Sequence, residues 1–395
     1  MYEKQVPDGV EDCLPEECAI KRDIENRLRS EFYKSGYDEI ETPAYEYYDV
    51  FQGGVGSYMQ ESMIKFIDPK GRILVLRPDI TVPIARVAAT KLGGGVKRLF
   101  YIQDSFSCAE PAAGKAGQFT QAGVELIGDA AYQADAEVIA LAVRALKTAG
   151  LREFTIDIGQ VAFFKGLING LQCNDNQADE LRHAVDSKDI GAIESAAEKI
   201  GMGAYLKEKI LRLPGLFGKK EVFDEALSLS DSGECAAAVE NLRNVYALLE
   251  SLGLEEHISV DLGILHDIAY YSGIIFRGIT PGIGFPVVSG GRYDGLLERF
   301  GEPAAATGFA LGIKRVMIAM ERQGLLKGGL GGVTVVSCAA PQCGIAAQFA
   351  DSLKARGKRA VLYAGLSKDE TKAFKNKTGA AEAVYIGPDG AEERL

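Results

Sequence analysis

The chain has 395 residues, of which 47% are hydrophobic, so it can bury a core large enough for two domains or for one domain with insertions. Its net charge of −11 at pH 7 and isoelectric point near 5.1 argue against a nucleic-acid binder, which needs a concentrated basic face to neutralise phosphates. No apolar run is long enough to span a membrane, and the N-terminal stretch lacks the apolar segment of a secretory signal. We therefore expect a soluble cytoplasmic protein.

The cysteines and histidines do not predict a metal site. The seven cysteines are scattered without a CxxC pair, and the chain contains only three histidines. Free thiols are the rule for a cytoplasmic chain with this spacing. We expect neither a metal nor another cofactor.

The first elements in chain order alternate helix and strand. Apolar residues recur every four positions and predict a helix over about 16–35. Residues 37–51 predict a strand that is broken at a proline. Residues 71–90 predict a buried strand that turns at an Arg-Pro pair into a helix.

A predicted hairpin and a predicted helical insertion follow. Residues 96–108 and 118–128 predict two strands joined by a Gly/Ala-rich loop. A helix and a strand come next, and then a charged segment typical of helices covers about 173–255, which we interpret as an insertion. Further strands and a closing helix reach about residue 320. The long returns between strands favour a mainly antiparallel sheet of six or seven strands.

The sequence indicates a domain boundary near its C-terminal end. Residues 325–332 are Gly-rich and unpatterned, as in a linker. Residues 333–395 alternate strand and helix in a small α/β module. We therefore expect a core over 1–324 that carries the insertion, followed by this module.

Short motifs occur in a fixed order along the core. They are PDGVEDCLP near the start, LRPDIT, QFTQAGVELIG, and the series AYYSGIIF, SGGRYDGLLERFG and GFALGIKRV. Together they resemble the catalytic core of class II histidyl-tRNA synthetases over most of residues 1–320. The resemblance implies an α+β fold: a class II aminoacyl-tRNA synthetase-like core with a mainly antiparallel sheet, a helical insertion and a short C-terminal module similar to a truncated anticodon-binding domain.

The part of the pattern that would handle ATP is altered. In the synthetases a loop of the form FRxERPxxGRxRQFxQ places arginines and a glutamate around the nucleotide, where guanidinium groups clamp phosphates. In the same register, Ser107, Glu110 and Gly117 replace arginines, Ala109 replaces the glutamate, and Lys115 keeps a positive charge. Each lost contact to a transferring phosphoryl group typically lowers the rate about a hundred-fold or more. We expect no adenylate formation and no catalytic residues.

The part of the pattern that would hold the amino acid is better preserved. Free histidine offers an ammonium, a carboxylate and a ring with two distinct nitrogens, so a specific pocket needs directional polar partners. By match to the synthetase pocket, the resemblance implies that the ammonium is held by Asp79, Thr81 and Gln121. It implies that the imidazole is read by Glu125 and Tyr270, with Tyr271 beside them.

Two positions are possible secondary contacts. His266 stands where the synthetases have an arginine near the substrate carboxylate, and a neutral imidazole cannot supply the guanidinium fork. Arg315 in GFALGIKRV is retained. Without the other arginines, we expect it to position a loop rather than to bind ATP.

Structural interpretations of the same residues remain open. Asp79 or Thr81 could cap the following helix. Glu125 needs a partner if it is buried, and a base on the facing hairpin strand, such as Lys97 or Arg98, could supply one instead of a ligand.

The later motifs also have structural interpretations. Tyr270 and Tyr271 lie in a predicted aromatic strand, where neighbours face opposite ways, so at least one should pack in the core. The stretch GGRYDG, residues 290–295, predicts a tight turn that leads into a helix, and it lacks the Lys-Ser/Thr ending of a P-loop.

Within the superfamily, the RPDIT motif, the short C-terminal module and the lost arginines most resemble the regulatory subunits of ATP phosphoribosyltransferase. The resemblance implies a non-catalytic subunit that the short catalytic subunit requires for activity, and that mediates feedback inhibition by histidine in the first step of histidine biosynthesis. It also implies a homodimer through the core and a hetero-octamer with the catalytic chain. No tRNA and no membrane partner are expected.

Two other functions stay open. A residual amino-acid-activating enzyme could use Lys115 and Arg315 in place of the lost arginines, and histidine-dependent pyrophosphate exchange would reveal it. A tRNA-binding factor is a weaker alternative, because the short C-terminal module interleaves lysines with acids.

Overall fold

The structure is a computed structural model, and it describes residues 3–52, 61–108, 117–169, 171–230, 232–265, 270–326 and 329–395. Its contacts define two compact units. The first comprises Met1–Asp12 and Lys21–Leu326, and the second comprises Cys13–Ile20 and Lys327–Leu395. No helix in the described ranges is both long and apolar enough to cross a membrane.

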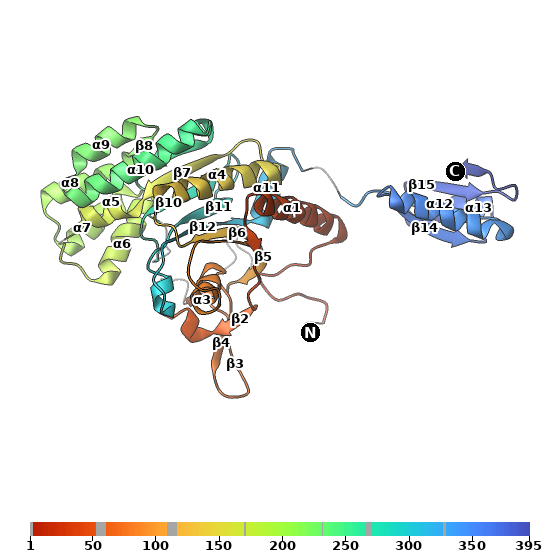
Figure 1. The fold of residues 1–395 in the computed structure, drawn as a ribbon, viewed down its shortest axis with the longest axis horizontal. Helices are drawn as coiled ribbons and strands as arrows, with labels where there is room; N and C mark the ends of the chain where they lie inside the picture. The colour runs from red at the N-terminus through yellow and green to blue at the C-terminus, as the bar shows by residue number, and fades with distance from the viewer. Residues whose placement is uncertain are drawn as a thin grey trace. The chain divides into compact units, whose positions relative to one another are not determined.

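A nine-stranded sheet forms the centre of the first unit (Figure 1). In spatial order its strands are β1 (Asp38–Glu39), β5 (Lys97–Phe106), β6 (Gln118–Ile127), β12 (Ala306–Gly312), β11 (Val288–Arg292), β10 (Ile274–Ile279), β7 (Thr155–Gln160), β9 (Ile258–Asp261) and β8 (Phe217–Gly218). Neighbours are antiparallel except for the pairs β1–β5 and β7–β9. The expected six or seven strands were too few, because β1 and β8 are only two residues long and carry no period-two pattern.

Long helices cover one face of this sheet. They are α1 (Pro15–Lys34) and α4 (Tyr132–Ala149), with α11 (Ile313–Arg322) beside them (Figure 1). Phe32 of α1 packs against Phe100 of β5 and Phe309 of β12, with ring centroids 5.6 and 6.0 Å apart. These contacts come from the four-residue apolar repeat that predicted α1.

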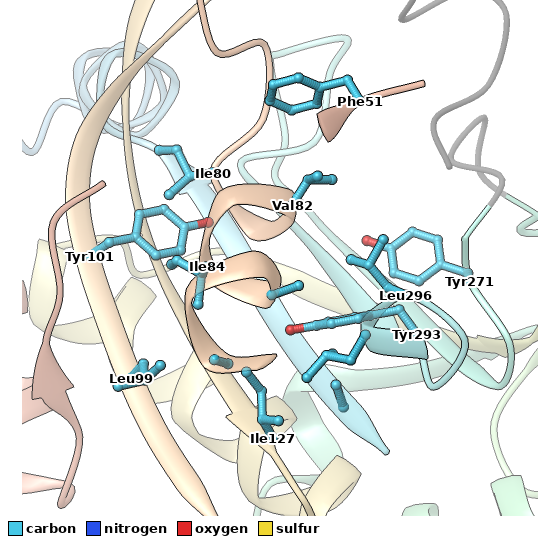
Figure 2. Close-up of a cluster of buried hydrophobic side chains, with 14 of the residues drawn as sticks. Phe51, Ile80, Val82, Ile84, Leu99, Tyr101, Ile127, Tyr271, Tyr293 and Leu296 are labelled. Atoms are coloured by element: carbon cyan, nitrogen blue, oxygen red, sulfur yellow. The ribbon is translucent and has the colours of Figure 1, made fainter. Parts of the chain in front are cut away.

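A second group of elements packs against the opposite face. It comprises the small sheet β2 (Tyr45–Tyr47), β4 (Ile73–Leu76) and β3 (Lys65–Ile67), followed by α3 (Thr81–Lys91). Figure 2 shows the buried cluster in which residues of α3 meet β5, β6 and the segments that carry Tyr271 and Tyr293. The hydrophobic face of α3 therefore packs against the hairpin that follows it in sequence and against distant segments that carry Tyr271 and Tyr293.

Helices account for the insertion, as the charged helical patterns indicated. Within about 173–255 they are α6 (Asp175–Asp186), α7 (Ile190–Ile200), α8 (Ala204–Arg212), α9 (Glu221–Leu229) and α10 (Gly233–Ser251), and α5 (Val161–Leu167) precedes them. Side chains of Asn174, Asp189 and Ser232 accept backbone N–H groups at the starts of α6, α7 and α10. Such caps satisfy donors that a helix cannot pair internally.

The second unit contains a four-stranded sheet and two helices. Strand β13 (Val333–Cys338) lies between β14 (Arg359–Ala364) and β15 (Glu382–Ile386), parallel to both, and β16 (Glu392–Arg394) adds antiparallel to β15. The helices are α12 (Cys343–Ala355) and α13 (Lys368–Thr378). Their apolar side chains form a separate core.

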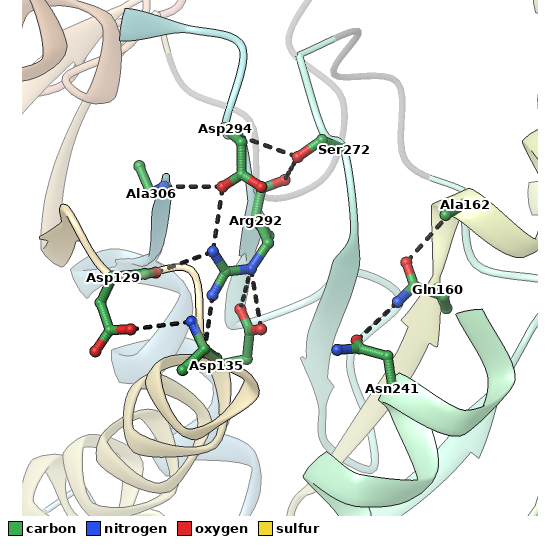
Figure 3. A network of polar contacts seen from close by, with 10 residues as sticks. Asp129, Asp135, Gln160, Ala162, Asn241, Ser272, Arg292, Asp294 and Ala306 are labelled. Carbon is green, nitrogen blue, oxygen red and sulfur yellow. Dashed lines mark hydrogen bonds and ion pairs between the residues drawn. The ribbon is translucent and has the colours of Figure 1, made fainter. Parts of the chain in front are cut away.

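A buried arginine ties the sheet to α4 (Figure 3). Arg292 Nε donates to both carboxylate oxygens of Asp135 at 3.0 Å, and Nη1 donates to Asp294 at 3.2 Å and to the Asp129 carbonyl at 3.1 Å. The Arg292 and Asp135 side chains are 8% and 1% exposed. Removal of one partner from such a pair leaves an uncompensated buried charge.

We expect Arg292→Met to lower the free energy of unfolding by about 3–5 kcal/mol, because Asp135 would remain buried without its counter-charge. The matched control is Arg212→Met, whose partner Glu225 lies at the surface, and it should cost about 1 kcal/mol or less. Urea unfolding followed by circular dichroism measures both. If both variants lost the same free energy of unfolding, the buried ion pair would contribute no more to stability than the surface pair.

Candidate functional site

Alternating residues of β6 form the floor of a cavity. Gln121, Gly123 and Glu125 are spaced by two and share one face of the strand. Across the strand pair they face Gly312, Ala310 and Gly308 of β12, in that order. The small partners leave room above the polar residues. A Cβ atom on Gly308 would lie 2.0 Å from Glu125 Oε2, so any larger residue would displace the carboxyl group.

The cavity has a volume of about 190 Å³. This is below the roughly 300–1,000 Å³ typical of sites for drug-sized ligands, so it suits a ligand about as large as one amino acid. All six predicted histidine ligands line the cavity, and so does the secondary candidate Arg315. The six are Asp79, Thr81, Gln121, Glu125, Tyr270 and Tyr271. The other secondary candidate, His266, lies outside the described residues.

The turn before α3 fixes Asp79. Arg77 donates to the carbonyls of Asp104 at 2.7 Å and Pro43 at 3.1 Å, and so clamps the turn to β5. Asp79 Oδ1 accepts the Val82 N–H at 2.7 Å and caps α3, so the structural interpretation of this residue is correct. Its Oδ2 accepts the Tyr270 hydroxyl at 3.3 Å. Burial raises the pKa of Asp79 to about 6, although these hydrogen bonds oppose the shift.

Glu125 is bound by hydroxyl groups rather than by a base. Thr81 Oγ1 donates to Oε1 at 2.7 Å, and the Tyr293 hydroxyl donates to Oε2. The suggested bases on the facing strand are wrong, because Arg98 pairs with Glu137 at 2.9 Å and Lys97 donates to the Gly95 carbonyl at 3.1 Å. Glu125 is 1% exposed. Burial raises its pKa to about 8, and the two hydroxyl donors only partly offset this effect.

The structure corrects the strand assignment of the tyrosine pair, but it confirms that one of the two rings packs in the core, because Tyr271 belongs to the buried cluster. Tyr270 and Tyr271 precede β10, which begins at Ile274, so the alternation of a strand does not apply to them. Both line the cavity, with ring centroids 5.2 Å apart in an edge-to-face arrangement. Lys165 of α5 donates to the Tyr271 carbonyl at 3.1 Å. Helix α5 therefore helps to hold the segment that carries both rings.

Tyr293 was missed by the sequence analysis. The expected turn is confirmed only for the second half of GGRYDG. Gly290, Gly291 and Arg292 pair within β11, whereas the Leu296 N–H donates to the Tyr293 carbonyl at 3.2 Å in a turn that leads into the short 3-10 helix η4 (Leu297–Phe300). The Tyr293 ring lies 5.8 Å from that of Tyr270, in an edge-to-face arrangement. The only signal for it was its place in a quoted motif, since no periodicity relates residue 293 to residue 125.

Two further polar residues of the cavity are Gln121 in β6 and Arg315 in α11. Ser105 donates to Gln121 Oε1 at 2.9 Å and thereby orients the amide. Arg315 Nη1 donates to the Pro286 carbonyl at 3.0 Å, and its guanidinium lies 5.4 Å from the centre of the Phe285 ring. Burial lowers the pKa of Arg315. The expected loop-positioning contact is present, and the same side chain also lines the cavity.

The positions of the altered ATP loop are only partly described. Ala109, Glu110 and Lys115 lie outside the described residues. Ser107 ends the hairpin strand, where its N–H donates to the Gly117 carbonyl at 2.9 Å. A Cβ atom on Gly117 would lie 3.0 Å from the Gly9 carbonyl oxygen. A long cationic side chain at residue 117 would therefore have to shift the N-terminal segment.

The cavity combines hydroxyl groups, an amide, two carboxyl groups and one guanidinium, which is a set of partners for a small polar ligand. Among the residues that the structure describes, no cluster of three or more His, Cys, Asp or Glu could hold a metal ion. The described cysteines are all free thiols.

The buried Glu125 should make stability depend on pH. Its folded pKa of about 8 exceeds the unfolded value, so the folded state binds more protons and loses stability as the pH rises from about 4.5 to 8. We compare the free energy of unfolding of Glu125→Gln with that of the parent at each pH. We expect this difference to favour the variant by about 2–5 kcal/mol more at pH 9 than at pH 5. Urea unfolding at both pH values measures the difference. A difference that does not change with pH would contradict this assignment.

Comparisons with known proteins agree with this geometry. A family model described as histidyl-tRNA synthetase matches residues 9–316. The ATP phosphoribosyltransferase regulatory subunit of Acetivibrio thermocellus is 48% identical over 319 residues, which cover 80% of this chain and 76% of that protein. The protein of the same name from Clostridium acetobutylicum is 37% identical over 378 residues, covering 94% of this chain and 92% of that one.

A solved structure extends the similarity to the second unit. It is described as an ATP phosphoribosyltransferase regulatory subunit/histidyl-tRNA synthetase from Bacillus halodurans, with a TM-score of 0.83 and 32% identity, and the match covers 98% of this chain and 99% of that one. The expected class II synthetase-like α+β fold is thereby confirmed. The chain belongs to the family of ATP phosphoribosyltransferase regulatory subunits, which is related to the histidyl-tRNA synthetases.

Proposed function

We propose that this chain, a regulatory subunit without synthetase activity of its own, binds histidine in the cavity and passes the signal to a separate ATP phosphoribosyltransferase catalytic chain. One observation carries the proposal. The cavity keeps a complete set of partners for an amino acid with a basic side chain, whereas Ser107 and Gly117 stand where phosphate-binding arginines would be needed.

The groups of histidine match the lining side chains by charge and hydrogen bonding. Asp79 would accept the ammonium, with Gln121 beside it, and its carboxyl group is mostly ionised above its pKa of about 6. Glu125 and Tyr270 would bind the imidazole. Arg315 would bind the carboxylate, because its guanidinium is the one cationic group among the described lining residues.

Such a pocket selects strongly among amino acids. Each carboxylate oxygen of Glu125 already accepts one hydroxyl group, from Thr81 and from Tyr293, and keeps one further acceptor site. A ligand without a hydrogen-bonding ring would leave these further sites of a buried group unfilled, which is costly. The histidine specificity of a feedback inhibitor would follow from this penalty.

Residual activation of histidine is the alternative function. It would need cations around the ATP phosphates in place of the missing arginines. Arg315 is turned toward the Pro286 carbonyl, and the hairpin end offers a serine and a glycine at positions 107 and 117. These groups support binding of the amino acid better than they support transfer of an adenylyl group.

The proposed assembly follows the family. We propose a homodimer through the core and a hetero-octamer with the short catalytic subunit, located in the cytoplasm and without a tRNA ligand. Histidine would control the catalytic chain by binding one conformation of the complex more tightly than another, since a ligand with equal affinity for both shifts nothing.

The direct test is reconstitution. The rate of phosphoribosyl-ATP formation by a short catalytic subunit is measured with and without this chain, and with added histidine. We expect this chain to activate the catalytic subunit and histidine to suppress that activation. A catalytic rate that does not respond to this chain would reject the proposal.

A substitution assigns the effector site. Glu125→Gln should weaken inhibition by histidine about ten-fold or more, because a charge-assisted contact is lost, while the rate without histidine stays near that of the parent. Glu198→Gln in α7, which removes a surface ion pair with Lys207, is the control and should leave inhibition unchanged. Inhibition curves of the reconstituted complex measure both. Unchanged inhibition in Glu125→Gln would place the effector site elsewhere.

A further inference from the structure

The surroundings of Glu125 do not fix its protonation state. Its two carboxylate oxygens contact the hydroxyl groups of Thr81 and Tyr293, one each. A hydroxyl group can donate to a carboxylate or accept from a carboxylic acid by rotating its hydrogen. The site can therefore hold Glu125 with or without a proton, and what enters the cavity decides between the two forms.

Few of the groups that surround Glu125 carry a charge. The titratable and charged groups that face it or share its cavity come from five segments. They are Asp79 in the turn before α3, Tyr101 in β5, Tyr270 and Tyr271 before β10, Tyr293 after β11, and Arg315 in α11. Burial and the nearby carboxyl groups raise the pKa of the four tyrosines, so they are neutral hydroxyl groups.

The charge balance of the occupied cavity follows from this inventory. The ammonium and carboxylate of an amino acid would match Asp79 and Arg315, and this pairing leaves Glu125 facing the side chain of the ligand. If Glu125 were ionised opposite a neutral ring, the cavity would bury a carboxylate without a counter-charge, which is unfavourable. One proton on the Glu125–ring pair removes that excess charge.

We propose that Glu125 and the imidazole of bound histidine share one titratable proton, in addition to the N–H that a neutral imidazole always carries, so that the occupied cavity is electrically neutral. This inference rests on the histidine-binding function proposed above and deepens it. The cavity would read not only the shape of the ring but also its ability to accept or carry a proton. In the pair, the Tyr270 hydroxyl remains available to the second ring nitrogen.

The proposal gives affinity a defined pH profile. Free imidazole titrates near pH 6.5, and the pKa of Glu125 in the empty cavity is about 8. Between these values the single proton is already on Glu125, so binding neither takes up nor releases one. Above pH 8 both Glu125 and the free ring lack the titratable proton, so binding must take one up from solution. The affinity for histidine then falls about ten-fold per pH unit. Below about pH 6.5 a proton must be released, and protonation of Asp79 weakens binding further.

Calorimetry on the full chain tests the proton directly. L-histidine is titrated at pH 7 and pH 9 in buffers with different ionisation enthalpies, using the parent and Glu125→Gln. At pH 9 the parent should take up about one proton more than Glu125→Gln. Its affinity should fall about ten-fold more between the two pH values. Titration of the ammonium of histidine itself affects both proteins equally and cancels in the comparison.

A second variant covers the case in which Glu125→Gln binds too weakly to measure. Tyr293→Phe keeps the carboxyl group but removes one donor to its ionised form, so the alkaline fall in affinity should move to higher pH. Equal proton uptake in the parent and Glu125→Gln, or an alkaline limb that does not move in Tyr293→Phe, would overturn the proton pair while leaving histidine binding intact. No binding of histidine at any pH would overturn the proposed function as well.

Discussion

A carboxyl group buried on the face of a sheet is the constraint around which the site is built. Glu125 can occupy this position only because the facing residue on β12 is glycine, and because hydroxyl groups arrive from α3 and from the end of β11. The pairing of β6 with β12, the docking of α3 and the strand β11 must all be correct before Glu125 has its partners. The site therefore depends on the whole central sheet rather than on one loop.

The two halves of the synthetase-like site have different structural support. The amino-acid half stands on the sheet floor and on the capped start of α3, where Asp79 serves both the helix and the cavity. The nucleotide half belongs to the far end of the β5–β6 hairpin. Positions 107 and 117, which the structure describes, are not among the residues that line the cavity. Under the proposed function, the absence of the phosphate-binding arginines leaves the lining residues of the amino-acid pocket in place.

The sequence predicted the elements that follow a local rule. The four-residue repeat of α1, the hairpin and the Arg-Pro turn before α3 are found. Gln121 and Glu125, four positions apart in β6, lie on one face of that strand. Contacts set by distant pairing could not be predicted. Tyr293 reaches Glu125 across 168 positions of sequence, and Tyr270 and Tyr271 lie before β10 rather than in it. The short edge strands also depend on neighbours rather than on their own residues.

Under the proposed function, binding of histidine without its activation would separate this chain from a synthetase. The most direct measurement uses one preparation of the full chain for two assays: calorimetric titration with L-histidine, and histidine-dependent exchange of pyrophosphate into ATP, with a histidyl-tRNA synthetase as positive control. We expect saturable binding and an exchange rate no higher than without histidine. Exchange that depends on histidine would contradict this view, because it would show that the altered hairpin still supports formation of the adenylate.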